Sequence, residues 1–289
     1  MNGIINLIKP PDMTSNDIVV YLRWLLGIKK IGHTGTLDPG ASGVLPICLG
    51  KATRLFGYLV EKPKEYLAEI HLGIVTDTED NHGTVLRRNE AHVRKTELSE
   101  TLRRFTGDIM QTPPMYSAVR QSGRKLYEIA RSGGKAQAAP RQTTIYRARL
   151  VRKTSESSWL IKIKCSKGTY IRTLCSDIGD SLGCGAHMSL LIRTASGPFL
   201  LEEAYTLEEL RSLHESGCIS KAVIPMDLPL TEMGEAVLPP SCREDITSGR
   251  QIAWGGPAED GLLKVYCGQE FIGIGKAGAG VLRIKTLLI

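Results

Sequence analysis

A carboxylate in a conformationally restricted loop is the feature of this sequence best suited to chemistry. Asp38 lies in residues 32–46, where four glycines and two prolines occur in fifteen positions. This composition excludes a regular helix or a central strand, and Pro39 biases Asp38 away from the helical region. The apolar run at 44–49 should anchor the loop on the core. The stretch therefore predicts a shaped loop that presents one acid, although an Asp before Pro is also common in turns without any catalytic role.

The overall composition limits the class of protein. The 289 residues contain 37 Lys and Arg against 30 Asp and Glu, a net charge of +7. This excess favours an anionic partner such as nucleic acid, and a merely basic enzyme fits the charge equally well. The seven cysteines include no C-x-x-C pair, so we expect reduced thiols and neither a disulfide framework nor a zinc site. We find no signal peptide and no run near the ~20 apolar residues of a membrane span, and we expect a cytoplasmic protein.

Periodicity predicts alternating strands and helices along the first two thirds of the chain. Residues 64–73 alternate, with Tyr66 on the apolar face of a half-buried strand. Ser15 is the expected N-cap of a helix that Gly27 ends. We also expect strands at 3–8, 159–165 and 185–194, and helices at 96–105, 170–182 and 207–214.

Three polar segments are open to functional and to plain structural interpretations. The turn at 76–83 lacks the full spacing of a calcium loop, so we expect a solvated turn. Lys162 and Lys164 give the 159–165 strand one basic face. Arg172 falls in the first turn of its helix, where it opposes the helix dipole and requires a nearby carboxylate or phosphate.

Residues 111–141 differ in character from their surroundings. Prolines restrict residues 112–120 to an extended form, and we expect the tract 132–140, which is poor in apolar anchors, to be mobile. A basic series runs through the segment, as in mobile loops that order on RNA, although a plain surface loop fits nearly as well. The series is Arg120, Arg124, Lys125, Arg131, Lys135 and Arg141.

Several motifs in order carry a resemblance to a known family. Residues 32–55, GHTGTLDPGASGVLPICLGKATRL, resemble the catalytic loop of the TruB family of tRNA pseudouridine synthases. The opening K-P-x-G-x-S-S segment is similar at 9–15, with Asp12 and Thr14 as departures. The K-x-Y, L-G-x-x-T-D-T-x-D and Q-x-P-P-x-Y-S segments match at 64–66, 72–80 and 111–117. CSKGTYIR at 165–172 and GAH at 185–187 resemble the second and third catalytic motifs.

The resemblance implies an isomerisation of uridine to pseudouridine in RNA that requires no cofactor and no metal. The C1′–N1 bond breaks, the base turns, and C5 bonds to C1′. Asp38 would be the catalytic carboxylate and nucleophile, and its attack at C1′ or at C6, or removal of a C2′ proton, stay open alternatives. Arg172 would pair with Asp38 and keep it ionised, and Tyr66 would stack on the base and assist proton transfer.

The resemblance also suggests supporting contacts. His33 would contact the flipped-out nucleotide or its neighbour, and Leu191 and Tyr170 would line the uracil pocket. Ile192 stands where the family often has Arg, so that polar contact is lost or moved to Arg193. Lys9 would support the loop or lie near the RNA.

The implied fold is α+β, with a pseudouridine synthase catalytic domain over residues 1–228. This domain would contain a mixed, mostly antiparallel sheet with flanking helices and loops, and a basic RNA-gripping insertion at about 111–141. Residues 229–289 read as short strands split by glycines and resemble a small PUA-like β-barrel that binds RNA. The substrate would be uridine-55 in the T-loop of tRNA, bound through the T-arm by a monomer without a protein partner.

Three other functions compete with this interpretation. A dyskerin-type synthase would depend on a guide RNA and partner proteins, and the 111–141 segment argues against it. A non-catalytic RNA-binding or RNA-folding protein would not need the intact trio of Asp38, Tyr66 and Arg172. A glycosidase-like hydrolase would need a second acid at the proper spacing, and none is evident.

Overall fold

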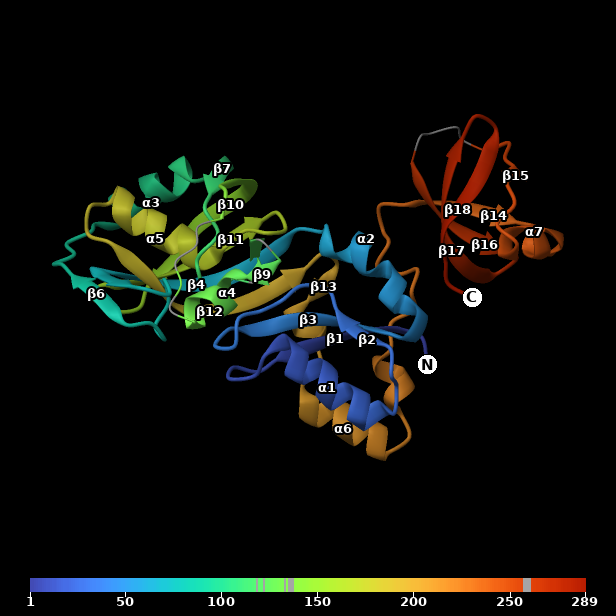
Figure 1. The fold of residues 1–289 in the computed structure, drawn as a ribbon, viewed down its shortest axis with the longest axis horizontal. Helices are drawn as coiled ribbons and strands as arrows, with labels where there is room; N and C mark the ends of the chain where they lie inside the picture. The colour runs from blue at the N-terminus through green and yellow to red at the C-terminus, as the bar shows by residue number, and fades with distance from the viewer. Residues whose placement is uncertain (118, 122, 133, 135–137, 257–260) are drawn as a thin grey trace. The chain divides into compact units, whose positions relative to one another are not determined.

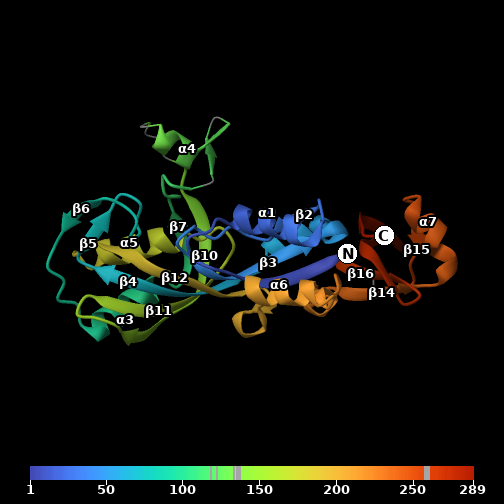
Figure 2. The same cartoon turned by 90° about the horizontal axis from the view of Figure 1, so that it is seen from below.

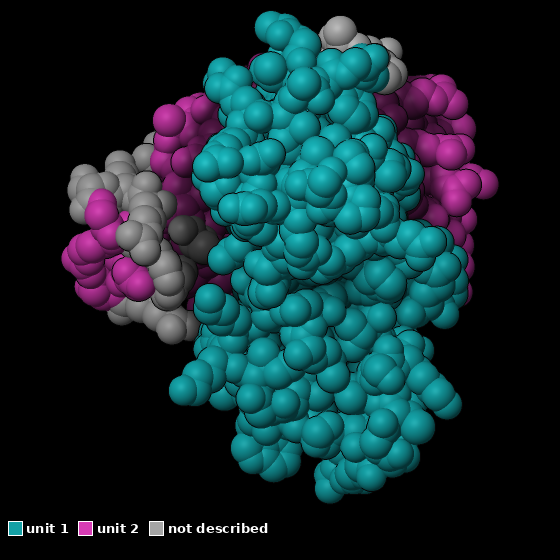
Figure 3. All heavy atoms as spheres, turned by 90° about the vertical axis from the view of Figure 1, so that its right-hand side faces the viewer, with its two compact units in different colours: residues 1–39, 44–61, 197–289 teal, residues 40–43, 62–196 magenta. Residues whose placement is uncertain are grey.

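The computed structural model describes residues 1–289 except 118, 122, 133, 135–137 and 257–260. Contacts divide the chain into two compact units, which Figure 3 shows in separate colours. Unit 1 comprises Met1–Pro39, Val44–Glu61 and Gly197–Ile289, and unit 2 comprises Gly40–Gly43 and Lys62–Ser196. Within the described chain, every helix is too short or too polar to cross a bilayer.

In the first part of unit 1, strands β1 and β3 are hydrogen-bonded neighbours, and helices α1 and α6 pack on one of their faces (Figure 1). Ile5 and Leu7 of β1 contact this helical layer, whereas Ile4 contributes to a second core on the opposite face. The elements are β1 (Gly3–Lys9), α1 (Ser15–Leu26), β2 (Ile31–His33), β3 (Ser42–Leu49), η1 (Gly50–Leu55), α2 (Phe56–Val60), β13 (Phe199–Leu200), η2 (Leu201–Glu203), α6 (Leu207–Glu215) and η3 (Ile219–Ala222).

Helix α1 begins one residue earlier than the sequence indicated. Thr14, not Ser15, is the N-cap: its hydroxyl accepts from the Asp17 N–H at 3.1 Å, and the Asp17 carboxylate accepts from the Thr14 N–H at 2.8 Å. This reciprocal capping box satisfies backbone donors that the first turn would otherwise leave unpaired. Gly27 ends the helix with φ 65°, as predicted. Ser15 is thereby released for a different contact.

Unit 2 is built on a sheet in the order β12–β4–β11–β10–β7, with each neighbouring pair antiparallel. Ser42 and Gly43 add a parallel pairing to β12, so the predicted mixed, mostly antiparallel sheet is confirmed. The elements are β4 (Lys64–Leu72), β5 (Ile74–Thr76), β6 (Val85–Arg88), α3 (Lys95–Arg104), β7 (Gly107–Gln111), β8 (Arg120–Gln121), β9 (Arg124–Lys125), α4 (Leu126–Arg131), β10 (Arg141–Lys153), β11 (Ser158–Cys165), α5 (Ile171–Ser181) and β12 (Ala186–Ser196).

One face of this sheet is buried and the other is open. On β4 the predicted alternation holds, because Tyr66, Ala68, Ile70 and Leu72 are buried and the residues between them are half-buried. Helix α5 packs on β12 and β4, helix α3 packs on β10, and the two helices contact each other. They therefore cover the buried face, and the second face keeps the charged side chains of β10 and β11.

The segment 111–141 is partly structured. Strands β8 and β9 pair with each other, and α4 follows directly. Within the tract 132–140, for which mobility was predicted, Gly133 and residues 135–137 lie outside the described part of the chain, and so does Lys135 of the basic series. Arg141 is not loop but the first residue of β10, a thirteen-residue strand that the sequence pattern did not predict.

The C-terminal part of unit 1 forms a separate sheet in the order β14–β16–β17–β18–β15. The short strands expected here are present as β16, β17 and β18, which pair in antiparallel order, and β14 pairs in parallel with β16. Val265, Ile272 and Leu282 lie in its core. The elements are β14 (Gly234–Leu238), η4 (Pro240–Cys242), α7 (Arg243–Thr247), β15 (Ile252–Ala253), β16 (Leu262–Cys267), β17 (Glu270–Gly278) and β18 (Val281–Leu287). Figure 2 shows these strands and α7 in a second view.

Candidate active site

The loop that carries Asp38 is held by a buried serine. The Ser15 hydroxyl accepts from the Leu37 N–H at 2.9 Å and donates to the Leu37 carbonyl at 3.2 Å. Ser15 and Leu37 are 2% and 3% exposed, so both backbone groups of Leu37 lie where water cannot replace the hydroxyl. Asp38, the next residue, is half-buried. The first helical residue of α1 thus fixes the backbone immediately before the predicted catalytic acid.

Lys9 fixes the backbone on the other side of Asp38. Its ammonium, on a fully buried side chain, donates to the carbonyls of Pro10, Met13 and Pro39 at 2.7, 2.6 and 3.0 Å. The Asp12 N–H donates to the same Pro39 carbonyl at 2.9 Å. These bonds support the loop-anchoring alternative that the sequence offered for Lys9.

Two further residues of unit 1 explain details of the motif. Asp12 has φ 64°, in the left-handed region that favours glycine, which is the residue the family pattern has at that position. His33 ends β2 and is half-buried, and its Nδ1 accepts a long hydrogen bond from the Gly35 N–H at 3.4 Å. His33 therefore shapes the bend that leads into the loop.

In unit 2, strand register brings three predicted residues together. Tyr66 of β4 lies directly opposite Arg193 of β12, and Leu191 lies opposite Ala68, so all three side chains share the buried face of the sheet. They are 9%, 1% and 7% exposed. The backbone of Gly43 packs closely on that of Arg193, because a Cβ on Gly43 would come 2.3 Å from the Arg193 carbonyl oxygen. The phenol, the isobutyl and the guanidinium side chains form one buried cluster that combines an aromatic ring, an apolar wall and a cation.

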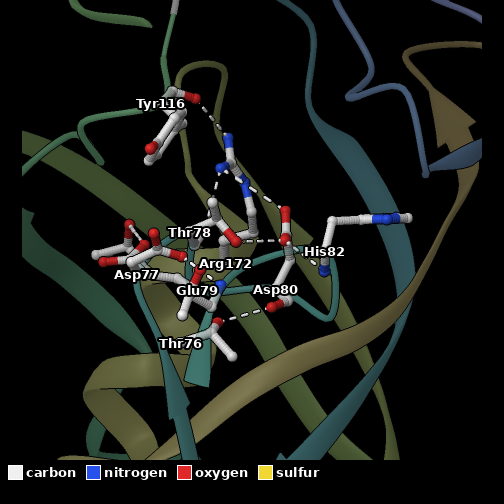
Figure 4. A network of polar contacts seen from close by, with 10 residues as sticks. Thr76, Asp77, Thr78, Glu79, Asp80, His82, Tyr116 and Arg172 are labelled. Carbon is white, nitrogen blue, oxygen red and sulfur yellow. Dashed lines mark hydrogen bonds and ion pairs between the residues drawn. The ribbon is translucent and has the colours of Figure 1, made fainter. Parts of the chain in front are cut away.

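Arg172 is the centre of a polar network (Figure 4). Its guanidinium donates to the carbonyls of Thr78 and Tyr116 at 3.2 and 3.0 Å and lies 3.9 Å from the Asp80 carboxylate. The side chain is 6% exposed, so these contacts occur in a poorly solvated environment, where charge pairing is strong. Of the two anions expected near Arg172, a carboxylate or a phosphate, the structure provides a carboxylate, that of Asp80.

The turn at 76–83 is solvated only in part: Asp77, Asn81 and His82 are exposed, whereas Asp80 is turned toward Arg172. The Asp80 carboxylate accepts from the Thr78 hydroxyl at 2.6 Å and from the His82 N–H at 3.0 Å, and the Thr76 hydroxyl donates to the Asp80 carbonyl at 2.6 Å. These bonds hold the turn in a conformation in which the Thr78 carbonyl and the Asp80 carboxylate face Arg172 (Figure 4). Gly40, two residues after Asp38, lies against it, since a Cβ would come 2.3 Å from His82 Nε2.

Glu79 adds a second link between this turn and helix α5. It has φ 62°, and its carboxylate accepts from the Thr173 hydroxyl at 2.7 Å. Burial raises the pKa of the Glu79 carboxyl, and the hydrogen bond from Thr173 and the charge of Arg172 oppose this rise. Because Thr173 follows Arg172 directly, the bond fixes the helical turn from which the arginine extends.

Tyr170, the N-cap residue of α5, is held by a buried amide. Its N–H donates to Gln111 Oε1 at 3.1 Å, and its carbonyl accepts from Gln111 Nε2 at 3.2 Å. Gln111 is 2% exposed, whereas the Tyr170 side chain is half-buried. The sequence did not single out Asp80 or Gln111 as site residues, and it indicated only a capping role for Ser15. All three fall inside the motifs quoted above, which was the available signal.

Comparison with solved structures defines the class of this fold. One chain of the crystal structure of a Cbf5-Nop10-Gar1 complex superposes with a TM-score of 0.77 at 29% identity, over 99% of this chain and 85% of that one. A chain of an H/ACA RNP bound to a substrate RNA containing 2′-deoxyuridine gives 0.76 at 27% identity, over the same shares. The fold is therefore that of the Cbf5- and TruB-like pseudouridine synthases, with a half-barrel sheet at the C-terminus that is consistent with a PUA-like domain.

Sequence comparison gives the family. The family model for the N-terminal domain of the TruB family pseudouridylate synthases matches residues 23–171. Models of the tRNA pseudouridylate synthase B C-terminal domain and of the pseudouridine synthase II TruB C-terminus match residues 172–231 and 234–288. A protein of Alkaliphilus oremlandii named tRNA pseudouridine synthase B is 44% identical over 95% of this chain and 93% of its own length. This chain belongs to the TruB family of pseudouridylate synthases, and the predicted resemblance is confirmed.

Proposed function

We propose that this protein converts uridine-55 in the T-loop of tRNA to pseudouridine. The observation that carries the proposal is the match over nearly the full chain to relatives named tRNA pseudouridine synthase B. In this reaction the C1′–N1 bond breaks, the C5–C1′ bond forms, C5 loses its proton to solvent and N1 gains one. The reaction is an isomerisation, and it requires no oxidant and no external group.

Asp38 is the proposed catalytic carboxylate and nucleophile, with Arg172 as its counter-charge. Ser15 and Lys9 hold the residues on either side of Asp38, and such backbone fixation favours a reactive geometry. A guanidinium in a poorly solvated place lowers the pKa of a carboxyl group that pairs with it, which would keep the acid ionised. Attack at C1′, attack at C6 and removal of the C2′ proton are the steps open to this carboxylate.

Tyr66, Leu191 and Arg193 are the proposed walls of the uracil pocket. Their common sheet face supports this assignment, because a flipped-out base needs an aromatic surface and an apolar contact to replace its lost stacking. Stacking on Tyr66 would contribute about 1–3 kcal/mol. His33 and Tyr170 are proposed to contact the target nucleotide or its neighbours, and Lys9 to act through the loop alone.

Residues 1–228 are the proposed catalytic domain and residues 229–289 the RNA-binding PUA-like domain. We propose that the enzyme acts in the cytoplasm as a monomer on the T-arm, without a protein partner. A guide-RNA-dependent synthase is the second candidate, because one structural neighbour is a chain of an H/ACA RNP bound to a substrate RNA and another is a chain of a Cbf5-Nop10-Gar1 complex. The higher identity to tRNA pseudouridine synthase B, 44% against 29%, favours direct recognition of tRNA.

The test is nucleoside analysis of an unmodified tRNA transcript after incubation with the purified protein alone. We expect one pseudouridine per transcript and none when uridine-55 is replaced by cytidine. Formation of pseudouridine elsewhere, or only after a guide RNA is added, would contradict the proposal.

A further inference from the structure

The open face of the unit 2 sheet carries a row of cations on β10 and β11. Register places Arg147 opposite Lys164 and Arg149 opposite Lys162, and Arg152 lies opposite Leu160. Lys164, Lys162 and Leu160 in turn lie opposite Glu65, Leu67 and Glu69 of β4, which alternate with the buried residues of that strand. The basic face, defined as Arg147, Arg149, Arg152, Lys162 and Lys164, is thus opposite to the sheet face that carries Tyr66, Leu191 and Arg193.

Two irregularities in β10 keep its arginines on this face. The register shifts between Ile145 and Arg147 and again between Leu150 and Arg152. Each bulge inserts one residue and so resets the alternation of side chains. Ile145 and Leu150 can therefore face the core while Arg147, Arg149 and Arg152 all stay exposed.

The positive charge of the basic face is only partly neutralised. Lys162 and Lys164 share the single carboxylate of Glu65, each at 3.3 Å. Among the described residues, no acidic side chain forms an ion pair with Arg147 or Arg149. Both lysines are partly exposed and Glu65 is half-buried, and ion pairs that reach the surface contribute little, so a polyanion could displace or join them at small cost.

The spacing suits a nucleic acid backbone. Alternate residues of a strand lie about 6.6 Å apart, and directly opposed residues of neighbouring strands have Cβ atoms about 5 Å apart. Two cations therefore meet at each of two adjacent positions, with a separation close to that of successive phosphates in one RNA strand. Arginine also binds phosphate through two parallel N–H donors.

We propose that the basic face binds the phosphate backbone of double-stranded RNA, independently of the catalytic site. The regular spacing and the arginines favour RNA over an acidic protein. The inference rests on the proposed function only in taking RNA as the kind of molecule that is bound. The RNA bound by the basic face is a duplex, and it does not enter the uracil pocket.

The test uses the full-length protein and a fluorescent RNA duplex without a T-loop, with binding followed by anisotropy across a salt series. We expect Arg147→Ala/Arg149→Ala to weaken affinity about tenfold and to lower the salt slope by about 2, as the loss of two phosphate contacts requires. The matched control, Arg94→Ala/Arg211→Ala, removes the same charge from two exposed arginines: Arg94, the N-cap of α3, pairs with Glu97, and Arg211 pairs with Glu215 of α6. The control should bind within about twofold of the wild type, because affinity depends on the arginines that contact phosphate and these two lie outside the basic face.

Arg147→Glu/Arg149→Glu is the second variant, and we expect it to abolish duplex binding. The side chains of Arg147, Arg149, Arg94 and Arg211 are all exposed, and an unchanged melting temperature of each variant would verify its folding. Affinities equal to that of the control for both basic-face variants would overturn the proposal and leave an acidic protein as the class of partner. Because the readout is binding of a duplex without target uridine, it can succeed or fail whether or not the protein isomerises tRNA.

Discussion

The guanidinium of Arg172 lies 3.9 Å from the carboxylate of Asp80, and the same guanidinium donates to the backbone carbonyls of Thr78 and Tyr116. Asp80 is itself held by the Thr78 hydroxyl and the His82 N–H. The arginine proposed to face Asp38 is therefore oriented by a turn that has its own hydrogen-bond network. Asp80 acts through Arg172 and is a positioning residue.

Asp80→Ala should reduce turnover more than it reduces RNA binding. Hydrogen bonds to a charged group contribute about 1.5–3 kcal/mol, which corresponds to a loss in kcat of about 10- to 100-fold. Asp80→Asn keeps the acceptor oxygen and should be less affected. Single-turnover rates and tRNA affinities would be compared, and an equal loss of both would contradict a positioning role.

Arg172→Lys should lower turnover severely although the charge is kept. A lysine ammonium cannot reproduce the planar fork that reaches two carbonyls and a carboxylate. We expect a loss of at least about 100-fold in kcat/KM, which is about 2.7 kcal/mol of transition-state stabilisation. Near-normal kcat/KM for the lysine variant would remove Arg172 from the active site.

Ser15→Ala should destabilise the protein and disturb the Asp38 loop together. The change leaves the buried N–H and C=O of Leu37 without their partner, at a cost of about 1–3 kcal/mol. Urea unfolding measures the stability and single-turnover kinetics the chemical step. Ser212→Ala on the exposed face of α6 is the control, and it should change stability by less than about 0.5 kcal/mol. A Ser15→Ala protein that matches this control would show that the contact does not hold the loop.

Asp177 should make the protein less stable as the pH rises. Burial and the neighbouring Asp180 raise the pKa of Asp177 from 3.8 to about 6, so the folded state binds more protons than the unfolded state between these values. The contribution of Asp177 to the free energy of unfolding therefore falls as pH increases from about 4 to about 6, and it is constant above that range.

Asp177→Asn removes this penalty and should raise stability at pH 7 by about 1 kcal/mol, a figure reduced for solvent screening. Glu156→Gln, an exposed residue between β10 and β11, is the control. Urea unfolding at pH 4.5 and pH 7 separates the two variants. If Asp177→Asn raised the free energy of unfolding by the same amount at both pH values, this would argue against titration of the Asp177 carboxyl group.

Elements with one clear period were predictable from sequence. The β4 alternation around Tyr66 and the apolar face of α1 appear in the structure as the pattern indicated. Strand β10 was missed because its two bulges interrupt the alternation and its exposed arginines resemble a loop.

The site shows the same limit. The order of motifs singled out Asp38, Tyr66 and Arg172, since each motif is local. The contact between Ser15 and Leu37 and that between Asp80 and Arg172 could not be predicted, because each joins distant parts of the chain through tertiary packing. Thr14 was missed as the N-cap because Ser15 is an equally good capping residue by type.

The most direct test of the account is release of tritium from C5-labelled uridine in unmodified tRNA, with no guide RNA or partner protein added. Replacement of the C5 proton is required when C5 bonds to C1′. We expect release by the wild type in proportion to pseudouridine formed, and none by Asp38→Asn, which should still bind tRNA within several-fold. Tritium release by Asp38→Asn at the wild-type rate, or no release by a wild-type protein that binds the tRNA, would contradict it.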